Sequence, residues 1–194
     1  MEKVSIDDLL SNESYENQRA LLRKAMIDHK KTRRVQLGPN ITLHFEDYMT
    51  MRYQIQELMR AEKLSSVEGI REELEVYNPL IPDGTNLKAT LMIEYPDEDE
   101  RRQQLSRLVG IENMISIRIG VCDPVYPIAD EDLQRSTEDK TSAVHFLRFE
   151  FSEQAISAAK ENAIWSIVCE HENYSHQLVS IPDNVRDSLI RDFD

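Results

Sequence analysis

The sequence has few glycines and cysteines and none of the short motifs that mark the common catalytic and cofactor-binding folds. Among 194 residues there are five glycines and two cysteines, and no GxGxxG, GxxxxGK[ST], GxSxG, HExxH or CxxC motif occurs. This leaves no sign of a dinucleotide fold, a phosphate-binding loop, a nucleophile elbow or a familiar zinc motif. Cys122 and Cys169 lie far apart in apolar runs, which is typical of reduced, buried thiols in a cytoplasmic protein.

Long apolar runs are also missing. No segment approaches the roughly 18 apolar residues of a membrane helix, and the acidic N-terminus has no apolar signal core. We therefore expect a cytoplasmic protein that does not enter a membrane. The net charge of −13 argues against nonspecific binding to nucleic acid or to anionic lipid.

The charge is distributed unevenly along the chain. Residues 1–34 carry a net charge of +2, so the remainder carries −15. The basic segment ends in the cations Lys30, Lys31, Arg33 and Arg34. Cations suit the C-terminus of a helix, where unpaired carbonyl groups carry partial negative charge. We favour this helix-end interpretation, and the alternative is a docking patch for an acidic partner.

Strict alternation of apolar and polar residues identifies the strands. Leu87 to Tyr95 is the clearest case, and the pattern returns in the segments 41–45, 115–119 and 145–149. Strands with one apolar face favour an antiparallel sheet covered by helices. We predict an α+β domain with about five to six mainly antiparallel strands. The face bearing Leu91, Ile93, Ile117 and Ile119 is expected to be the core.

Helical patterns precede and interrupt these strands. We expect residues 1–34 to form an N-terminal helical segment packed on an α+β domain of residues 35–194. Asp47 is expected to cap a helix through Leu64, and Ser65 with Glu68 to open the next one. Residues 123–142 are acidic and interrupted by prolines, so they are predicted to be mostly loop, with a short edge strand at 125–128.

Two helical segments offer candidate ligand-binding residues. Gln54, Glu57 and Arg60 bring an amide, a carboxylate and a guanidinium together at helical spacing, so they are candidates for a polar pocket. The favoured interpretation is a solvated face or an ion pair between elements. Tyr77 and Asn78, at the end of the following helix, are further candidates for ligand binding.

The histidines offer the remaining chemistry. Cys169, His171 and His176 combine a thiol with two imidazoles, which suits zinc or a redox metal, but their spacing matches no established zinc pattern. We favour a buried thiol followed by a polar turn. His145 shares a strand face with apolar residues, so a core histidine is favoured over a catalytic base, although with Glu57 and Arg60 it remains a candidate.

Several ordered blocks resemble a bacterial family of uncharacterised domains over nearly the whole chain. The blocks are residues 52–62, 73–82, 89–96, 108–112 and 142–149. The resemblance implies no established activity. Members of the family are often encoded beside rubrerythrin-like and iron–sulfur proteins, which implies a role near peroxide or redox stress and a partner of that kind.

These observations lead to a functional expectation in which no motif dictates a reaction. We expect an accessory or interaction protein with a protein partner and without a cofactor of its own. An enzyme or small-ligand binder with a pocket at Gln54–Arg60 is the first alternative, and a metal-binding protein is the second. The sequence alone does not decide whether the protein is an enzyme.

Overall fold

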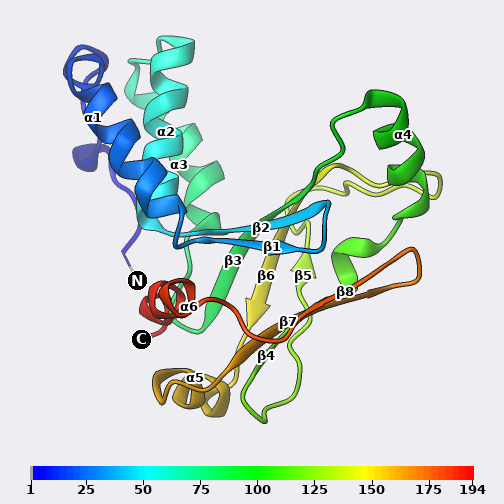
Figure 1. Cartoon of the computed structure of the whole chain (residues 1–194). Helices are drawn as coiled ribbons and strands as arrows, with labels where there is room; N and C mark the ends of the chain where they lie inside the picture. The colour runs from blue at the N-terminus through cyan, green and yellow to red at the C-terminus, as the bar shows by residue number, and fades with distance from the viewer. Residues whose placement is uncertain (1) are drawn as a thin grey trace.

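The alternating segments form two antiparallel sheets (Figure 1). The computed structural model describes residues 2–194 and confirms the α+β fold. The larger sheet has five strands in the order β1-β2-β3-β6-β5, and the smaller has the order β4-β7-β8. Their bounds are β1 Arg34–Leu37, β2 Ile41–Glu46, β3 Asn86–Ile93, β4 Ile115–Ile119, β5 Ile128–Ala129, β6 Val144–Glu150, β7 Trp165–His171 and β8 Tyr174–Leu178.

The apolar faces of the two sheets share one core. Phe45 and Leu91 of the larger sheet belong to the same buried cluster as Ile117 and Trp165 of the smaller sheet, and each is at most 1% exposed. The predicted core face is therefore confirmed, and the smaller sheet packs on this core together with helices. Alternation shows which face of a strand is buried but carries no information on what covers that face.

Three helices from the first part of the chain pack beside the sheets: α1 Asn12–Lys30, α2 Tyr48–Glu62 and α3 Val67–Tyr77. Two of them, α2 and α3, contribute to a separate apolar cluster. Met51, Ile55 and Met59 line the buried side of α2 and meet Ile70 of α3. Asp47 caps α2 as expected, while α3 is capped by Ser66, one residue later than predicted.

Shorter helices close the remaining sides of the two-sheet core. They are α4 Glu98–Arg107, α5 Glu153–Lys160, α6 Asp183–Leu189 and the 3-10 helices η3 Ile111–Asn113 and η4 Ile190–Asp192. Ala155 of α5 and Val185 and Leu189 of α6 are buried in the main cluster. Along residues 2–194, no helix combines the length and the apolar character needed to cross a membrane.

Two short segments differ from the sequence predictions. The edge strand β5 forms at Ile128–Ala129, whereas Val125 makes an isolated bridge to Ile117. The polar segment after Cys169 is a hairpin that continues into β8, rather than a turn alone. Residues 131–143 contain no helix or strand, as expected for this loop.

Candidate functional site

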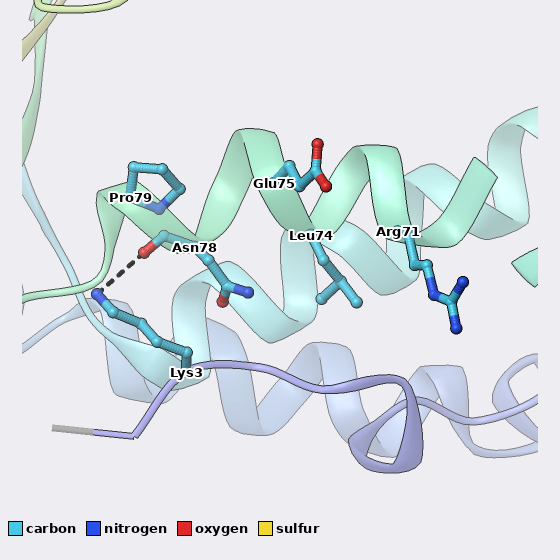
Figure 2. A pocket seen from close by; sticks show the side chains of 6 residues that line it. All are labelled: Lys3, Arg71, Leu74, Glu75, Asn78 and Pro79. Atoms are coloured by element: carbon cyan, nitrogen blue, oxygen red, sulfur yellow. Dashed lines mark hydrogen bonds between the residues drawn. The ribbon is translucent and has the colours of Figure 1, made fainter. Parts of the chain in front are cut away.

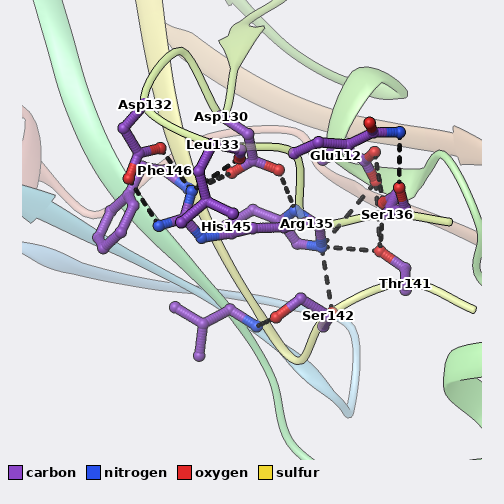
Figure 3. Close-up of polar contacts among 12 residues, drawn as sticks. Glu112, Asp130, Asp132, Leu133, Arg135, Ser136, Thr141, Ser142, His145 and Phe146 are labelled. Carbon is purple, nitrogen blue, oxygen red and sulfur yellow. Dashed lines mark hydrogen bonds and ion pairs between the residues drawn. The ribbon is translucent and has the colours of Figure 1, made fainter.

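A buried histidine on β6 is the centre of the most densely connected polar cluster. His145 pairs with Leu91 of β3 across the sheet, so its side chain points toward the apolar face of the sheet. Its exposed fraction is 0%. A buried imidazole needs hydrogen-bond partners for both ring nitrogens, and each nitrogen of His145 has them (Figure 3).

Asp130 holds one side of the ring. It follows β5 directly, and its backbone adopts the left-handed conformation with φ of 52°, which aspartate tolerates better than most residues. The Phe146 backbone N–H donates to Asp130 Oδ1 over 3.0 Å. Oδ2 lies 2.6 Å from His145 Nδ1. Asp130 therefore fixes the orientation of the imidazole, and Nε2 points to the other side of the cluster.

Glu112 approaches the Nε2 side from η3. This short helix begins after Gly110, whose φ of 85° favours glycine. Glu112 is 6% exposed, and its Oε2 lies 3.9 Å from His145 Nε2. A buried carboxylate is costly unless it is paired or hydrogen-bonded. The burial of the Glu112 carboxyl group therefore depends on the groups that hydrogen-bond to it.

Hydroxyl groups of the following loop fill the space between Glu112 and His145. Ser136 Oγ donates to Glu112 Oε1 over 2.7 Å and lies 2.8 Å from Thr141 Oγ1. Thr141 Oγ1 lies 2.8 Å from His145 Nε2, and the Ser142 carbonyl oxygen lies 3.1 Å from the same nitrogen. A continuous polar chain thus runs from Asp130 through the ring to Glu112.

The arginine of this cluster lies on its Asp130 side. The Arg135 guanidinium binds both carboxylate oxygens of Asp132 and lies 3.5 Å from Asp130 Oδ1, with its Cζ 4.6 Å from the Phe146 ring centroid. Within residues 2–194, no lysine or arginine nitrogen lies within 4.0 Å of the Glu112 carboxylate. The hydrogen-bond partners of the buried Glu112 carboxyl group are therefore hydroxyl groups, with the His145 imidazole 3.9 Å away.

Three residues of the cluster have donor atoms with the spacing expected around a metal ion. In the part of the chain that is described, Glu112, Asp130 and His145 are the single group of three such residues whose donor atoms all lie within 4.8 Å of one another. Ligand atoms about 2.1 Å from one ion lie roughly 3 to 4 Å apart. These three residues therefore form a candidate metal site, with Thr141 Oγ1 and the Ser142 carbonyl oxygen beside His145 Nε2.

The candidates on α2 serve a different purpose. Glu57 accepts hydrogen bonds from the Tyr15 hydroxyl over 2.6 Å and from Arg19 over 2.8 and 2.9 Å, and Arg60 lies 3.6 Å away. The Arg19 guanidinium lowers the pKa of Glu57 to about 2. Gln54 is exposed. Glu57 therefore joins α1 to α2, as the ion-pair interpretation expected.

Asn78 borders a surface pocket but is already bonded within the protein. Its side-chain amide forms two hydrogen bonds with the Val4 backbone, one as donor and one as acceptor. Its backbone carbonyl oxygen accepts a hydrogen bond from Lys3 Nζ over 3.1 Å. Figure 2 shows the pocket, whose volume is 490 Å³. Its lining residues are Lys3, Arg71, Leu74, Glu75, Asn78 and Pro79. Tyr77 is not among them, so the two candidates do not converge on this pocket.

The predicted basic patch loses one of its four members. Arg33 is 2% exposed, and its guanidinium is bonded to Asp192 and to the backbone carbonyls of Phe45 and Glu46. Including Arg33 in an exposed patch was therefore wrong, because Asp192 of η4 and two carbonyl groups of β2 bind its guanidinium in the interior. Lys30, Lys31 and Arg34 are exposed.

Cys169, His171 and His176 share one region of the smaller sheet without forming a compact ligand set. Cys169 pairs with His176 across β7 and β8. His171 Nε2 lies 3.2 Å from the Val109 carbonyl oxygen, and its Nδ1 accepts from the Asn173 backbone N–H. Burial raises the pKa of the Cys169 thiol, which disfavours the thiolate that binds metals.

His145 was a candidate from the sequence, whereas the residues that complete its cluster were not. Glu112, Asp130, Ser136 and Thr141 come from η3 and from the loop, and pairing of β5 with β6 brings this loop against η3. The sequence held one signal: the acidic residue Glu112 follows Gly110 and the apolar Ile111. That signal alone does not identify the partner segments.

Comparison with known proteins supplies a family without an assigned activity. Residues 3–193 match the family described as "Protein of unknown function (DUF3501)". A crystal structure of a novel protein of unknown function from Burkholderia pseudomallei is 47% identical, covers 100% of both chains and superposes with a TM-score of 0.95. No protein with curated annotation is significantly similar to the chain.

Proposed function

The chain belongs to the DUF3501 family of unknown function, and from the geometry of its buried cluster we propose that it binds one divalent metal ion. The ion lies between His145 Nε2 and Glu112 Oε2. The observation that carries this proposal is the pairing of a buried carboxylate that lacks an arginine or lysine partner with an imidazole nitrogen held 3.9 Å away.

The distances around Nε2 support a single coordination sphere. Thr141 Oγ1 and the Ser142 carbonyl oxygen lie 2.8 and 3.1 Å from Nε2, and Thr141 Oγ1 lies 3.5 Å from Glu112 Oε2. These separations match those of atoms that share an ion. In the metal-bound state, the Thr141 hydroxyl would keep its proton and offer its oxygen to the ion beside His145 Nε2 and Glu112 Oε2.

Asp130 has the place of an orienting carboxylate. Histidine ligands commonly donate their second ring N–H to a carboxylate, which sets the tautomer and raises the basicity of the ligating nitrogen. The 2.6 Å contact between Asp130 Oδ2 and His145 Nδ1 has this arrangement. The ligating nitrogen is then Nε2, and Asp130 acts on the ion through the ring.

The donor set selects the class of ion. One imidazole with a carboxylate, a hydroxyl and a carbonyl oxygen combines nitrogen and hard oxygen ligands without sulfur. Such a set suits Zn²⁺, Mn²⁺ or Fe²⁺ and disfavours ions that require thiolate. The net charge of two buried carboxylates is also better matched by a divalent cation than by one arginine.

Burial gives this site a structural character. His145 and Thr141 are 0% and 2% exposed, so the loop that carries Ser136 and Thr141 covers the ion. Metal binding therefore fastens the loop against η3 and β6. Ligand residues must lose protons to bind a metal, so affinity falls on acidification.

Isothermal titration calorimetry with Zn²⁺ and with Mn²⁺ tests the proposal on metal-stripped full-length protein. We expect saturation at one ion per chain, with binding lost in Glu112→Gln and His145→Gln. His171→Gln is the matched control and should bind normally. Absence of binding by the folded wild-type protein, or loss of binding only in the control, would contradict the proposed site.

Binding of Co²⁺ provides a second, spectroscopic readout that does not depend on the heat of binding. Co²⁺ bound by nitrogen and oxygen gives visible ligand-field bands without a thiolate charge-transfer band. Such a spectrum is expected for the wild-type protein and not for Glu112→Gln. A thiolate band would move the ion to the region of Cys169, which is the alternative set of ligands suggested by the sequence.

We further propose that the protein acts in the bacterial cytoplasm. The free thiols of Cys122 and Cys169 support a reducing compartment, and a relative from Burkholderia pseudomallei supports a bacterial family. A partner among rubrerythrin-like or iron–sulfur proteins remains a prediction from the family resemblance. Fractionation of the native host with an antibody to the chain tests the compartment.

A further inference from the structure

The outer face of α1 carries a stripe of cations that the fold does not use. Arg23, Lys24, Lys30 and Lys31 lie within one arc of the helix, because residues three, four and seven apart share a face. Ile27 lies in the middle of this arc and is 52% exposed. We name these five residues the α1 stripe, and all five are exposed.

The side chains of the stripe form few interactions with the rest of the protein. Lys31 pairs with Asp28 over 2.7 Å at the surface. Within residues 2–194, Arg23, Lys24 and Lys30 form no ion pair, and their side chains donate no hydrogen bond. Exposed cations of this kind contribute little to stability. The stripe is therefore free to meet another molecule.

The side of α1 next to the stripe attaches the helix to the rest of the molecule, through residues that are not part of the stripe. Tyr15 and Arg19 bind Glu57 of α2, and His29 Nε2 lies 2.7 Å from Asp47 Oδ2. In Figure 1, α1 lies along α2, with one side turned away from the other helices. The stripe can change without disturbing the contacts that position α1.

We propose that the α1 stripe is a docking surface for an acidic segment of a partner protein that places an apolar side chain over Ile27. Positive charge on this face contrasts with the chain as a whole, whose net charge is −13. The acidic body repels long anionic polymers and anionic lipid surfaces. A short acidic protein segment can contact the stripe alone, and Ile27 supplies an apolar anchor at its centre.

Site-specific photo-crosslinking in lysate of the native host tests this surface. The photoreactive residue benzoylphenylalanine replaces Ile27, and in a separate protein it replaces Val121, which is 98% exposed and lies outside the stripe. Mass spectrometry then identifies the crosslinked peptide. We expect Ile27 crosslinks to peptides of net negative charge that disappear at high salt and do not form from position 121.

A matched charge variant distinguishes an effect of the stripe from an effect of the net charge of the protein. Changing Arg23, Lys24, Lys30 and Lys31 to Gln should reduce the Ile27 crosslink at least about tenfold, which corresponds to about 1.4 kcal/mol of binding free energy. The control changes four other exposed cations to Gln and should keep the crosslink: Lys63, Arg102, Lys140 and Arg191. Melting temperatures of both variants should match that of the wild-type protein.

Several outcomes would overturn the proposal. Crosslinks to nucleic acid or lipid would assign the stripe to a different class of partner. Crosslinks that survive the stripe variant, that appear equally from position 121, or that are absent from position 27 would remove it as a docking surface. None of these outcomes depends on metal binding at His145, so the two proposals fail separately.

Discussion

Two buried charged clusters of similar composition balance their charges differently. Arg33, Asp47 and Asp192 meet beside His29, where the Arg33 guanidinium binds Asp192 over 2.5 and 3.0 Å and lies 3.6 Å from Asp47. His29 contacts Asp47 on its other side. In this cluster, each carboxylate has a cation or an imidazole in direct contact.

The His145 cluster also combines two carboxylates, a histidine and an arginine. Its arginine, Arg135, is directed to Asp130 and to the exposed Asp132, while the buried Glu112 carboxylate is bonded to hydroxyl groups. The comparison teaches that residue composition does not reveal the use of a buried cluster. The positions of the cations do reveal it: of the buried carboxylates in these two clusters, Glu112 has no lysine or arginine nitrogen of the described residues within 4.0 Å.

The largest expected effect comes from removing the cation of the balanced cluster. Arg33→Met leaves two buried carboxylates without their guanidinium, so we expect the free energy of unfolding to fall by about 3 to 5 kcal/mol. Denaturant unfolding near pH 8 measures this change. Arg34→Met is the control at an exposed neighbour and should change stability by less than about 0.5 kcal/mol.

Acid should partly rescue that variant. Burial raises the pKa of the Asp192 carboxyl to about 6, despite the opposing effect of Arg33. A raised pKa means that the folded state holds the proton more tightly, so its contribution is complete below the unfolded value of 3.8 and is lost as pH rises through about 6. The deficit of Arg33→Met should therefore be smaller near pH 5 than near pH 8, and an equal deficit would contradict this assignment.

The second effect distinguishes the clusters by their response to metal. Free Zn²⁺ at about 100 times its dissociation constant should stabilise the wild-type protein by about 2.7 kcal/mol. For a chain of this size, that raises the melting temperature by roughly 5 to 11 °C. Glu112→Gln should show no such rise, whereas His29→Gln, in the balanced cluster, should keep it. A rise that depends on His29 instead would reverse the comparison.

The positions of the strands could be predicted from the sequence. Alternation located β3, β4 and β6 to within a few residues because one face of each is buried. The helix cap at Asp47 was predictable because its side chain bonds a nearby backbone N–H group. These features are local, and local chemistry is visible in the sequence.

The division into two sheets and the His145 cluster depend on longer-range contacts. Thr141 and Glu112 lie 29 residues apart and touch only after the loop folds over η3. Arg33 reaches Asp192 across 159 residues. No periodicity records such pairings, so the exposed patch assigned to Arg33 was wrong for this reason.

A smaller effect tests the role of Asp130 as an orienting group. Asp130→Asn keeps an acceptor for the Phe146 N–H but removes the charge beside His145 Nδ1. We expect Zn²⁺ affinity to fall about 10- to 100-fold, as for other carboxylates that orient ligating histidines. Asp132→Asn is the matched control and should bind normally. Equal loss in both variants would indicate a general charge effect.

The smallest effect concerns the more exposed ion cluster between α1 and α2. Glu57→Gln should lower stability by about 1 kcal/mol or less at neutral pH, because partly exposed pairs are screened by water. Arg19 lowers the pKa of Glu57 to about 2 from 4.5, so its contribution is present above pH 4.5 and is lost as pH falls toward 2. Acid titration followed by circular dichroism should show the wild-type and variant curves converging over that range.

Anomalous diffraction from crystals soaked in Zn²⁺ or Mn²⁺ tests the central claim most directly. The account predicts a peak in the anomalous difference map about 2.1 Å from both His145 Nε2 and Glu112 Oε2. Crystals of Glu112→Gln, treated in the same way, should lack it. A map with no peak beside Glu112 in the wild-type protein, or with its peak among Cys169, His171 and His176, would contradict the account.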